Sequence, residues 1–481
     1  MTLPQKMLYG LFFGLLLGLV PLLPAADFAG AGPLYDRFSS TLFSGHRTEA
    51  LGPLFYHEQN ESTRTWSSPP LFSYTLNQDT DFEEFDFAYP FLTYDRFGAE
   101  YRFQIFQLFN FAGGQTQSEI NVSRFTLFPL YFQQRSLLPG KNYTALLPIY
   151  GHLQNRLFRD EIKFALMPLY IQSRKRDVVT DNYLYPFFHL RHGDGLKGWQ
   201  FWPLIGSEHK EVTTRTNHWE DVETIGGHDK FFALWPFFLN ETRGIGTENP
   251  ERQQALLPFY TYLRSPLRDS STYLWPFGVT RTVDREKKYT EWGAPWPLVS
   301  FARGEGKTTS RVWPFFSQAR TETLESDFYL WPVYKFNRIT SAPLDRQRTR
   351  ILFFLYSDLT EKNTETGATF HRRDLWPLFT ERHDFDGNSR WQIFAPLEPL
   401  LPNNKSIERN YSPLWSLWRS EQNAKTDSSS QSVFWNLYRS ESTPESRKCS
   451  LLFGLFQYES MAQRQHWRLL YLPIGQANRQ E

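Results

Sequence analysis

One short pattern recurs along almost the whole chain: an apolar residue, a proline, further apolar or aromatic residues, and then polar residues that usually include arginine. Clear copies are LFPLYFQQR (127–135), LMPLYIQSR (166–174), LLPFYTYLR (256–264), VWPFFSQAR (312–320) and LWPVYKFNR (330–338). Between Pro33 and Pro473 the copies follow one another at intervals of about 20 residues. Such a period indicates a repeat architecture in which each copy packs against its neighbours, so we expect one structural unit repeated about twenty-three times.

The prolines and tryptophans of this pattern are the candidate structural residues of the repeat. The clear motif prolines are Pro129, Pro148, Pro168, Pro186, Pro203, Pro236, Pro258, Pro276, Pro297, Pro314, Pro332, Pro377, Pro396, Pro413 and Pro473. Tryptophan directly precedes seven of them, at Trp202, Trp235, Trp275, Trp296, Trp313, Trp331 and Trp376. Weaker copies surround Pro33, Pro53, Pro70 and Pro90. The sequence predicts that the Trp-Pro pairs pack in the interior of the fold.

Each unit is expected to be a strand. Its centre is rich in aromatic and β-branched residues and contains a proline that would break a helix, while polar stretches such as HGDG (192–195) and ARGEGK (302–307) predict turns. The sequence therefore predicts an all-β fold: an antiparallel up-and-down meander of about 22–24 strands, closed as a barrel or curled into a shell. Because proline cannot donate a hydrogen bond to its neighbour strand, we expect a line of bulges where the motif prolines cross the sheet.

Composition excludes several classes of protein. Aromatic residues make up 17% of the 481 residues, which is far too many for a disordered chain. The formal net charge of +1 argues against nucleic acid as a partner. No Walker, Rossmann, Gly-x-Ser-x-Gly or Cys-His pattern is present, so we expect neither an enzyme nor a cofactor.

The N-terminus has the features of an export signal. One lysine precedes an uncharged apolar run at 7–23, which ends in prolines and small residues. We expect residues 1–26 to be a signal peptide and 27–481 to form a single β-repeat domain; an uncleaved anchor is the alternative. The only cysteine, Cys449, permits no intramolecular disulfide.

Two functions fit a chain of this kind. The first is an integral outer-membrane β-barrel with a structural or conduit role and outer-membrane lipid as its partner. The reason is that the apolar centres of the repeats would form a continuous apolar band around the barrel, with charged residues on both sides of it. The second is a soluble periplasmic or cell-surface shell that acts as a binding scaffold for glycans, lipids or envelope proteins. An apolar belt of five residues spans only about 16 Å, which is thin for a barrel and leaves the second function open.

The chain resembles extracytoplasmic bacterial proteins built of tandem L-[LWY]-P-[LF]-[FY]-x-x-x-R units, and more distantly, as a class, outer-membrane β-barrels. The resemblance covers nearly everything from Pro33 onward. It implies a β-repeat protein of the bacterial cell envelope and implies no particular activity. The polar C-terminus departs from outer-membrane barrels, which tend to end on an aromatic residue.

A weak metal-site candidate lies between Pro203 and Pro236, where the interval is longer than usual. The three histidines of this segment are His209, His218 and His228, and several carboxylates accompany them. Imidazole and carboxylate groups are ligands for Zn²⁺ and other divalent ions. No spacing here matches a known metal motif, so a solvated loop is the favoured interpretation. The arginines that follow the motif cores are expected to form cross-strand ion pairs rather than a phosphate-binding surface.

Overall fold

The fold is known from a computed structural model, which describes residues 31–114, 122–216, 221–461 and 464–478. The expected signal peptide lies outside these residues. Nearly all strands belong to one antiparallel sheet of 43 strands in which consecutive strands pair, and β20 and β21 form a separate two-stranded sheet. The all-β fold and the antiparallel meander are therefore confirmed.

The strands are short, most of them six residues long. The first stretch contains β1 (Asp36–Ser39), β2 (Gly45–Ala50), η1 (Gly52–Leu54), β3 (Phe55–Asn60), β4 (Thr63–Ser68), β5 (Phe72–Asn77), β6 (Phe82–Phe87), β7 (Leu92–Phe97), β8 (Glu100–Ile105), β9 (Phe109–Gly114), β10 (Val122–Leu127), β11 (Tyr131–Ser136), η2 (Pro139–Lys141), β12 (Tyr143–Leu146), β13 (Tyr150–Arg156) and β14 (Arg159–Ala165). The middle stretch contains β15 (Tyr170–Lys175), β16 (Val178–Tyr183), β17 (Phe188–Gly193), β18 (Leu196–Phe201), β19 (Ile205–Lys210), β20 (Thr213–Thr216), β21 (Val222–Ile225), β22 (Gly227–Ala233), β23 (Phe238–Ile245), β24 (Glu251–Leu256), β25 (Tyr260–Arg264), β26 (Arg268–Tyr273), β27 (Val279–Asp284), β28 (Tyr289–Gly293), β29 (Val299–Gly304) and β30 (Lys307–Val312). The last stretch contains β31 (Phe316–Thr321), β32 (Leu324–Tyr329), β33 (Tyr334–Ser341), β34 (Leu344–Ile351), β35 (Tyr356–Asn363), β36 (Thr369–Leu375), β37 (Phe379–His383), β38 (Ser389–Ile393), α2 (Lys405–Asn410), α3 (Ser412–Trp415), β39 (Trp418–Asn423), β40 (Ser428–Val433), β41 (Tyr438–Ser442), β42 (Ser446–Leu451), β43 (Phe456–Met461), β44 (Arg464–Leu469) and β45 (Leu472–Asn478).

The predicted strand count and the predicted place of the motif proline were both wrong. Each 20-residue unit is a hairpin of two strands, so the sheet has 43 strands instead of 22–24. From Pro70 to Pro377 every motif proline lies in a turn or bend between two strands, with no bulge at that point. The physical reason is that proline has no N–H for the ladder, and a turn needs none at that position. Pro396 lies in a bend outside the regular row, Pro413 lies in α3, and Pro473 lies in β45.

All these proline turns stand on the same edge of the sheet. In a meander of hairpins the turns alternate between two edges, and the motif occurs once in every two strands. The turns of the opposite edge are mostly polar, as at Asn60–Glu61, Arg176–Asp177 and Lys425–Asp427. One edge therefore carries the repeated Pro and aromatic residues, and the other carries mostly polar connections.

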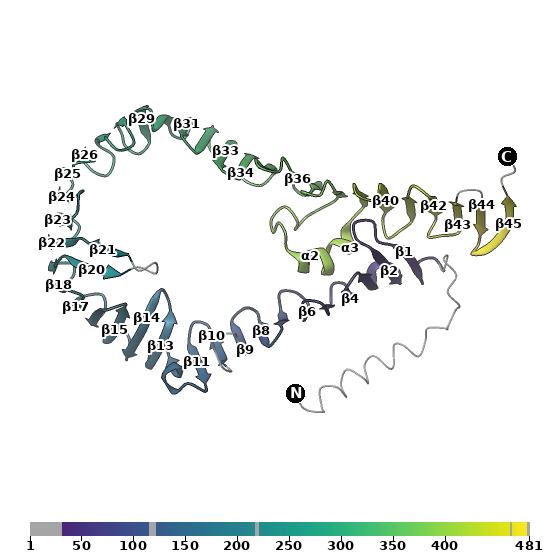
Figure 1. Ribbon diagram of the computed structural model, residues 1–481, viewed down its shortest axis with the longest axis horizontal. Coiled ribbons are helices and arrows are strands. Elements are labelled where there is room, and N and C mark those ends of the chain that lie inside the picture. The colour runs from purple at the N-terminus through teal and green to yellow at the C-terminus, as the bar shows by residue number, and fades with distance from the viewer. Residues whose placement is uncertain (1–30, 115–121, 217–220, 462–463, 479–481) are drawn as a thin grey trace.

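The sheet has an inner and an outer face, which the helices identify. Tyr56 Oη donates a hydrogen bond to the carbonyl of Arg409 at 3.0 Å, and Asn410 Nδ2 donates to Asp86 Oδ2 at 3.0 Å. Figure 1 shows α2 and α3 between the two arms of the strand row, so the face that carries Tyr56 and Asp86 is the inner one. Side chains alternate between the two faces along a strand. The pairing register therefore places each remaining strand residue on either the inner or the outer face. Small residues such as Ser67 and Ser73 are fully buried on the inner face.

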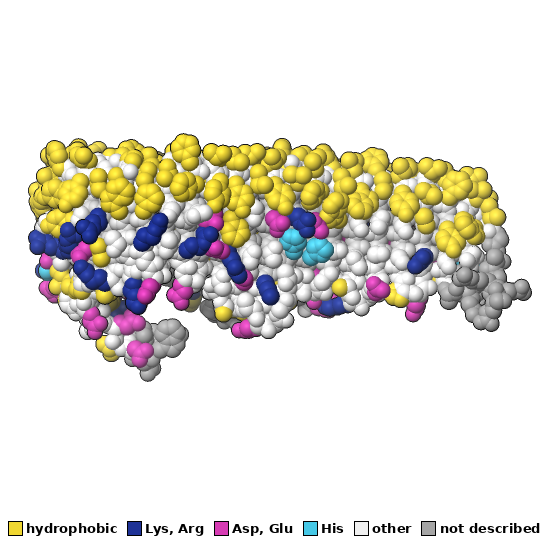
Figure 2. Space-filling view, turned by 90° about the horizontal axis from the view of Figure 1, so that it is seen from above, with side chains coloured by type: hydrophobic (Ala, Val, Ile, Leu, Met, Phe, Trp, Pro, Cys, Tyr) yellow, Lys and Arg dark blue, Asp and Glu magenta, His cyan; other side chains and the backbone are white. Residues whose placement is uncertain are grey.

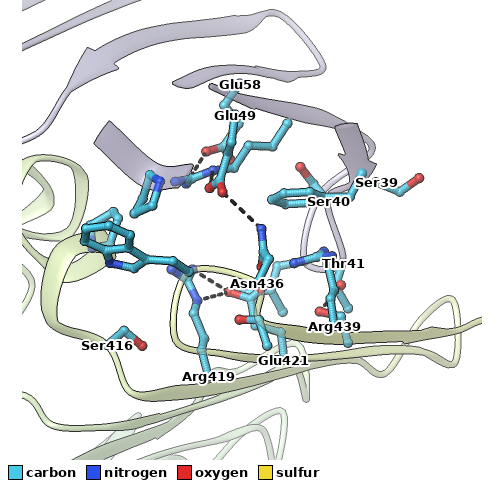
Figure 3. Close-up of a pocket in the computed structure, with 18 of the residues that line it drawn as sticks. Ser39, Ser40, Thr41, Glu49, Glu58, Ser416, Arg419, Glu421, Asn436 and Arg439 are labelled. Atoms are coloured by element: carbon cyan, nitrogen blue, oxygen red, sulfur yellow. Dashed lines mark hydrogen bonds and ion pairs between the residues drawn. The ribbon is translucent and has the colours of Figure 1, made fainter. Parts of the chain in front are cut away.

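The two arms meet at a seam, which we define as the inner faces of β1–β3 against those of β38–β41. Thr41 Oγ1 donates to Ser430 Oγ at 2.6 Å, Asn436 Nδ2 donates to Glu49 Oε2 at 3.0 Å, and the Arg439 guanidinium lies 3.5 Å from the centre of the Phe38 ring. Figure 3 shows Thr41 and Glu49 of one arm lying near Asn436 and Arg439 of the other. No pairing between β1 and β45 is present in the described part of the sheet, so closure by hydrogen-bonded strands is not observed.

The chain leaves the sheet between β38 and β39, over residues 394–417, and this segment we call the α2–α3 excursion. Asn404 caps α2 by accepting from the Ile407 backbone N–H. Glu398 is buried in the excursion and accepts hydrogen bonds from Gln392 Nε2 at 2.8 Å and Trp415 Nε1 at 3.0 Å. The excursion fills the space beside the seam.

Candidate functional site

The edge formed by the proline turns is apolar and exposed. Figure 2 shows hydrophobic side chains gathered along one long edge of the molecule, with charged side chains below them. Phe259, Phe277 and Phe315, each directly after a motif proline, are about 60% exposed, with values of 61%, 60% and 60%. Leu330, two residues before Pro332, is 60% exposed. A monomeric soluble protein rarely exposes a continuous apolar surface of this extent, so the edge is the candidate functional site.

The outer face continues this apolar surface below the turns. The last strand residue beside each turn pairs with the corresponding residue of the next strand, and in two long runs every such residue is apolar or tyrosine. The first run is Phe72, Phe87, Leu92, Ile105, Phe109, Leu127, Tyr131, Leu146, Tyr150, Ala165, Tyr170, Tyr183, Phe188, Phe201, Ile205, Ala233, Phe238, Leu256, Tyr260, Tyr273 and Val279. The second run is Val299, Val312, Phe316, Tyr329, Tyr334, Ile351, Tyr356, Leu375, Phe379, Ile393, Trp418, Val433, Tyr438, Leu451, Phe456, Leu469 and Leu472. We call these runs together with the proline turns the apolar edge.

The seven Trp-Pro pairs all lie in turns of the apolar edge, and several of their rings touch one another. Trp202 and Trp235 have ring centres 5.9 Å apart, and Trp313 and Trp331 have centres 6.2 Å apart. Trp235 is 50% exposed, and Trp275, Trp313 and Trp331 are 43–44% exposed. The expectation of interior packing is therefore wrong for these four tryptophans. A turn at a sheet edge has neighbouring turns on two sides only, so its large side chains remain about half exposed to solvent.

Ion pairs lie below the apolar edge on both faces. On the outer face Arg338 pairs with Asp345 at 2.8 Å and Arg174 with Glu161 at 3.1 Å. On the inner face Arg191 pairs with Glu208 at 2.7 Å. The predicted cross-strand ion pairs are thus confirmed for these arginines. These arginines lie three or four residues beyond the first residue of their strands, about 10–13 Å along the strand.

The histidines of the weak metal-site candidate do not converge. His209 and His228 lie in the neighbouring strands β19 and β22, but the register puts their side chains on opposite faces, because His209 opposes Asp229 and His228 opposes Lys210. His209 Nδ1 contacts Asp229 Oδ1, and His228 Nε2 lies 2.6 Å from Glu208 Oε1. His218 lies outside the described residues. Within the described ranges no three His, Cys, Asp or Glu side chains form a group able to hold an ion, and metal binding by this segment stays a prediction.

Sequence reasoning missed the seam and the α2–α3 excursion. Two acids of the acidic stretch at 79–86 anchor the excursion: Arg409 Nη1 donates to Glu84 Oε2 at 2.8 Å and Arg409 Nη2 donates to Asp86 Oδ2 at 3.3 Å. No sign of the interruption is visible in the sequence, because Pro377, Pro396 and Pro413 follow one another at nearly the usual interval. The partner of the acids lies more than 300 residues away, and no local pattern predicts that contact.

No protein-family model matches this chain, and no curated protein does so either. Among the described residues, no helix has the length and apolar character needed to cross a membrane.

Proposed function

We propose that this chain is an exported structural protein of the cell envelope that attaches to a lipid membrane by inserting its apolar edge into one leaflet. The observation that carries the proposal is the continuity of the apolar edge, whose large side chains remain exposed turn after turn. Full removal of one such side chain from water is worth about 1.5–3 kcal/mol. Because the edge carries many of them, lipid insertion would far exceed the marginal affinity of a single acyl anchor.

The depth of the apolar edge supports shallow insertion. A turn and two strand residues together extend about 7–10 Å, which matches the 5–10 Å to which interfacial proteins enter a leaflet. Tryptophans in the turns and arginines below them have the distribution expected at the boundary between acyl chains and headgroups. In this arrangement the sheet stands upright on the membrane, with its apolar edge in the leaflet and its polar edge in water.

The geometry favours insertion of the edge over a barrel that spans the membrane. A six-residue strand extends about 20 Å, and a transmembrane wall needs an apolar band of about 25 Å on its lipid side. The lower half of the outer face carries ion pairs such as Arg338 with Asp345. A spanning wall would have to bring these charges into the acyl region, at a cost of about 2–4 kcal/mol for each basic residue.

Flotation with lipid vesicles tests the proposal. The full chain, freed of detergent in the presence of vesicles of phosphatidylethanolamine and phosphatidylglycerol, should rise with the vesicles in a density gradient and should resist extraction at alkaline pH. A variant with F259D, F277D, F315D and L330D places four charges on four of five consecutive turns of the apolar edge, all at positions about 60% exposed. It should float at least about 100-fold less well, because four apolar groups leave the lipid and four charges would have to enter it.

The matched control carries four aspartates on the polar edge. Leu137, Leu157, Phe158 and Val222 are 66%, 66%, 97% and 70% exposed there, so L137D, L157D, F158D and V222D change composition and charge by a similar amount. This control should float like the unmodified chain. A chain that stays soluble without vesicles and does not float would reject lipid attachment and would support the soluble envelope scaffold instead.

A further inference from the structure

The inner face contains a hollow that the proposed attachment does not use. It has a volume of about 700 Å³ and lies over β13–β19 and β22, where Figure 1 shows the strand row turning from its lower arm to its left side. Its lining divides into an apolar part next to the apolar edge and a polar part further down the strands. A pocket of this size and mixed lining has the general character of a small-molecule site.

Phenylalanines that lie over glycines form the apolar part. Phe164 is 2% exposed and packs across Gly151, where an added Cβ would come within 2.5 Å of its ring. Phe232 is 3% exposed and packs across Gly206 in the same way, at 2.3 Å. Leu147, Met167 and Trp202, each directly before a motif proline, complete the lining on the side of the apolar edge. The two glycines therefore keep this wall of the hollow smooth and open.

Basic side chains dominate the polar part. Arg191, Gly198, Glu208 and Lys230 stand in one cross-strand row of the inner face. Glu208 accepts from Arg191 at 2.7 Å and contacts His228 at 2.6 Å, so its charge is already balanced. Within the described residues Lys230 makes no hydrogen bond or ion pair.

A further titratable group of this part, His189, is neutral. Burial, followed by the charge of Arg191, lowers the pKa of His189 to about 4. His189 therefore carries no charge near neutral pH, and its ring offers one donor and one acceptor. Among the side chains that line the hollow, Arg159, Arg191 and Lys230 outnumber the carboxylate of Glu208, so the polar part is net positive. Lys230 also lies opposite Glu241, which pairs with Arg243.

We propose that the hollow binds one anionic, phosphate-bearing lipid of the membrane, with its acyl chains against Phe164, Phe232 and Trp202 and its phosphate near Arg191 and Lys230. The order of the two parts agrees with a lipid in the leaflet that the apolar edge enters: acyl contacts lie level with the edge, and headgroup contacts lie level with the basic row. The identity of the ligand as a membrane lipid rests on the proposed function, whereas the chemistry of the hollow does not.

Native mass spectrometry of the full chain tests this site without a bilayer. The chain is purified in a non-ionic detergent, mixed with equal amounts of phosphatidylglycerol and phosphatidylcholine, and released from the micelle in the instrument. We expect one phosphatidylglycerol to be retained per chain in preference to phosphatidylcholine. K230Q should reduce this retention about tenfold, because it removes one of the basic side chains that line the hollow while leaving Phe164 and Phe232 in place.

The matched control is K197Q. Lys197 lies in β18 on the outer face, where it opposes His192 and His209, so its loss changes the net charge equally without touching the hollow. It should retain the lipid like the unmodified chain. Equal retention of the two lipids, or an equal loss in K197Q and K230Q, would overturn the site; displacement of the lipid by millimolar inorganic phosphate would show a site for free phosphate instead. Because flotation measures the edge and retention measures the hollow, either proposal can fail while the other stands.

Discussion

Two carboxyl groups of the seam have pKa values that move in opposite directions. Burial raises the pKa of Asp36 to about 6, because the charge of Arg439 offsets only part of the lost hydration. Burial would also raise the pKa of Glu421, but Arg419 and Arg390 outweigh it and lower that pKa to about 2. The number of guanidinium groups around each carboxylate decides whether its pKa is raised or lowered. The seam is therefore stabilised by Glu421 in its charged form and weakened by Asp36 in its charged form.

Replacing Asp36 by asparagine should stabilise the chain near neutral pH. With a folded pKa near 6 and an ordinary unfolded value of 3.8, the folded state binds more protons between these pH values, so the stability due to Asp36 falls as pH rises through this window. D36N should therefore raise the free energy of unfolding by about 1–3 kcal/mol at pH 7.5 and have little effect at pH 3.5. Urea unfolding at the two pH values measures this. D95N, which removes the carboxylate partner of the exposed Arg102, is the control, and a loss of stability in D36N at pH 7.5 would contradict the prediction.

At the scale of elements, the α2–α3 excursion ties the two arms of the sheet together. Arg409 is buried between α2 and β6, where it binds Glu84 and Asp86. Removing one partner of a buried charge cluster costs about 3–5 kcal/mol, because the other charges lose their compensation. No strand pairing between β1 and β45 replaces this contact in the described sheet.

The variant R409M should therefore loosen the two arms from each other while the strand row itself persists. We expect the radius of gyration from small-angle X-ray scattering to increase and the β signal in circular dichroism to remain unchanged. R102M, which removes an arginine that is 56% exposed, is the control and should leave both unchanged. An unchanged radius in R409M would show that the seam contacts alone hold the arms.

The sequence predicted the period and the fold class but not the elements within one unit. In the unit around Pro314, the aromatic centre VWPFF was interpreted as a strand, and the polar stretch after it as a turn. The structure places the proline in the turn, and β31 and β32 occupy most of the polar stretch. Strands such as β34, LDRQRTRI, are polar on both faces in their lower part, so they show no alternation that a sequence analysis could detect. The missing N–H of proline was the one local signal for the turn.

For the whole molecule, the meander implies that stability is shared between neighbours and that whole units can be removed. Deletion of residues 313–330 excises β31, β32 and one proline turn, and it joins Val312 to Trp331, so the turn of Pro332 replaces the turn of Pro314. Each excised strand accounts for about 4.8 Å of the row, so the wall shortens by about 10 Å. In a repeat protein each unit contacts its neighbours only, and we expect this variant to fold and to float with vesicles.

Deletion of a single strand should have the opposite result. Removal of residues 316–323 takes out β31 alone, and every later strand then runs in the reverse direction. The later proline turns would move to the polar edge, and the later arm could not reach the seam in its present orientation, so Arg439 could not lie against Phe38. We expect aggregation or loss of vesicle flotation for this variant, measured beside the whole-unit deletion by circular dichroism and flotation. Equal behaviour of the two deletions would mean that the segregation of the proline turns to one edge does not govern folding or lipid attachment.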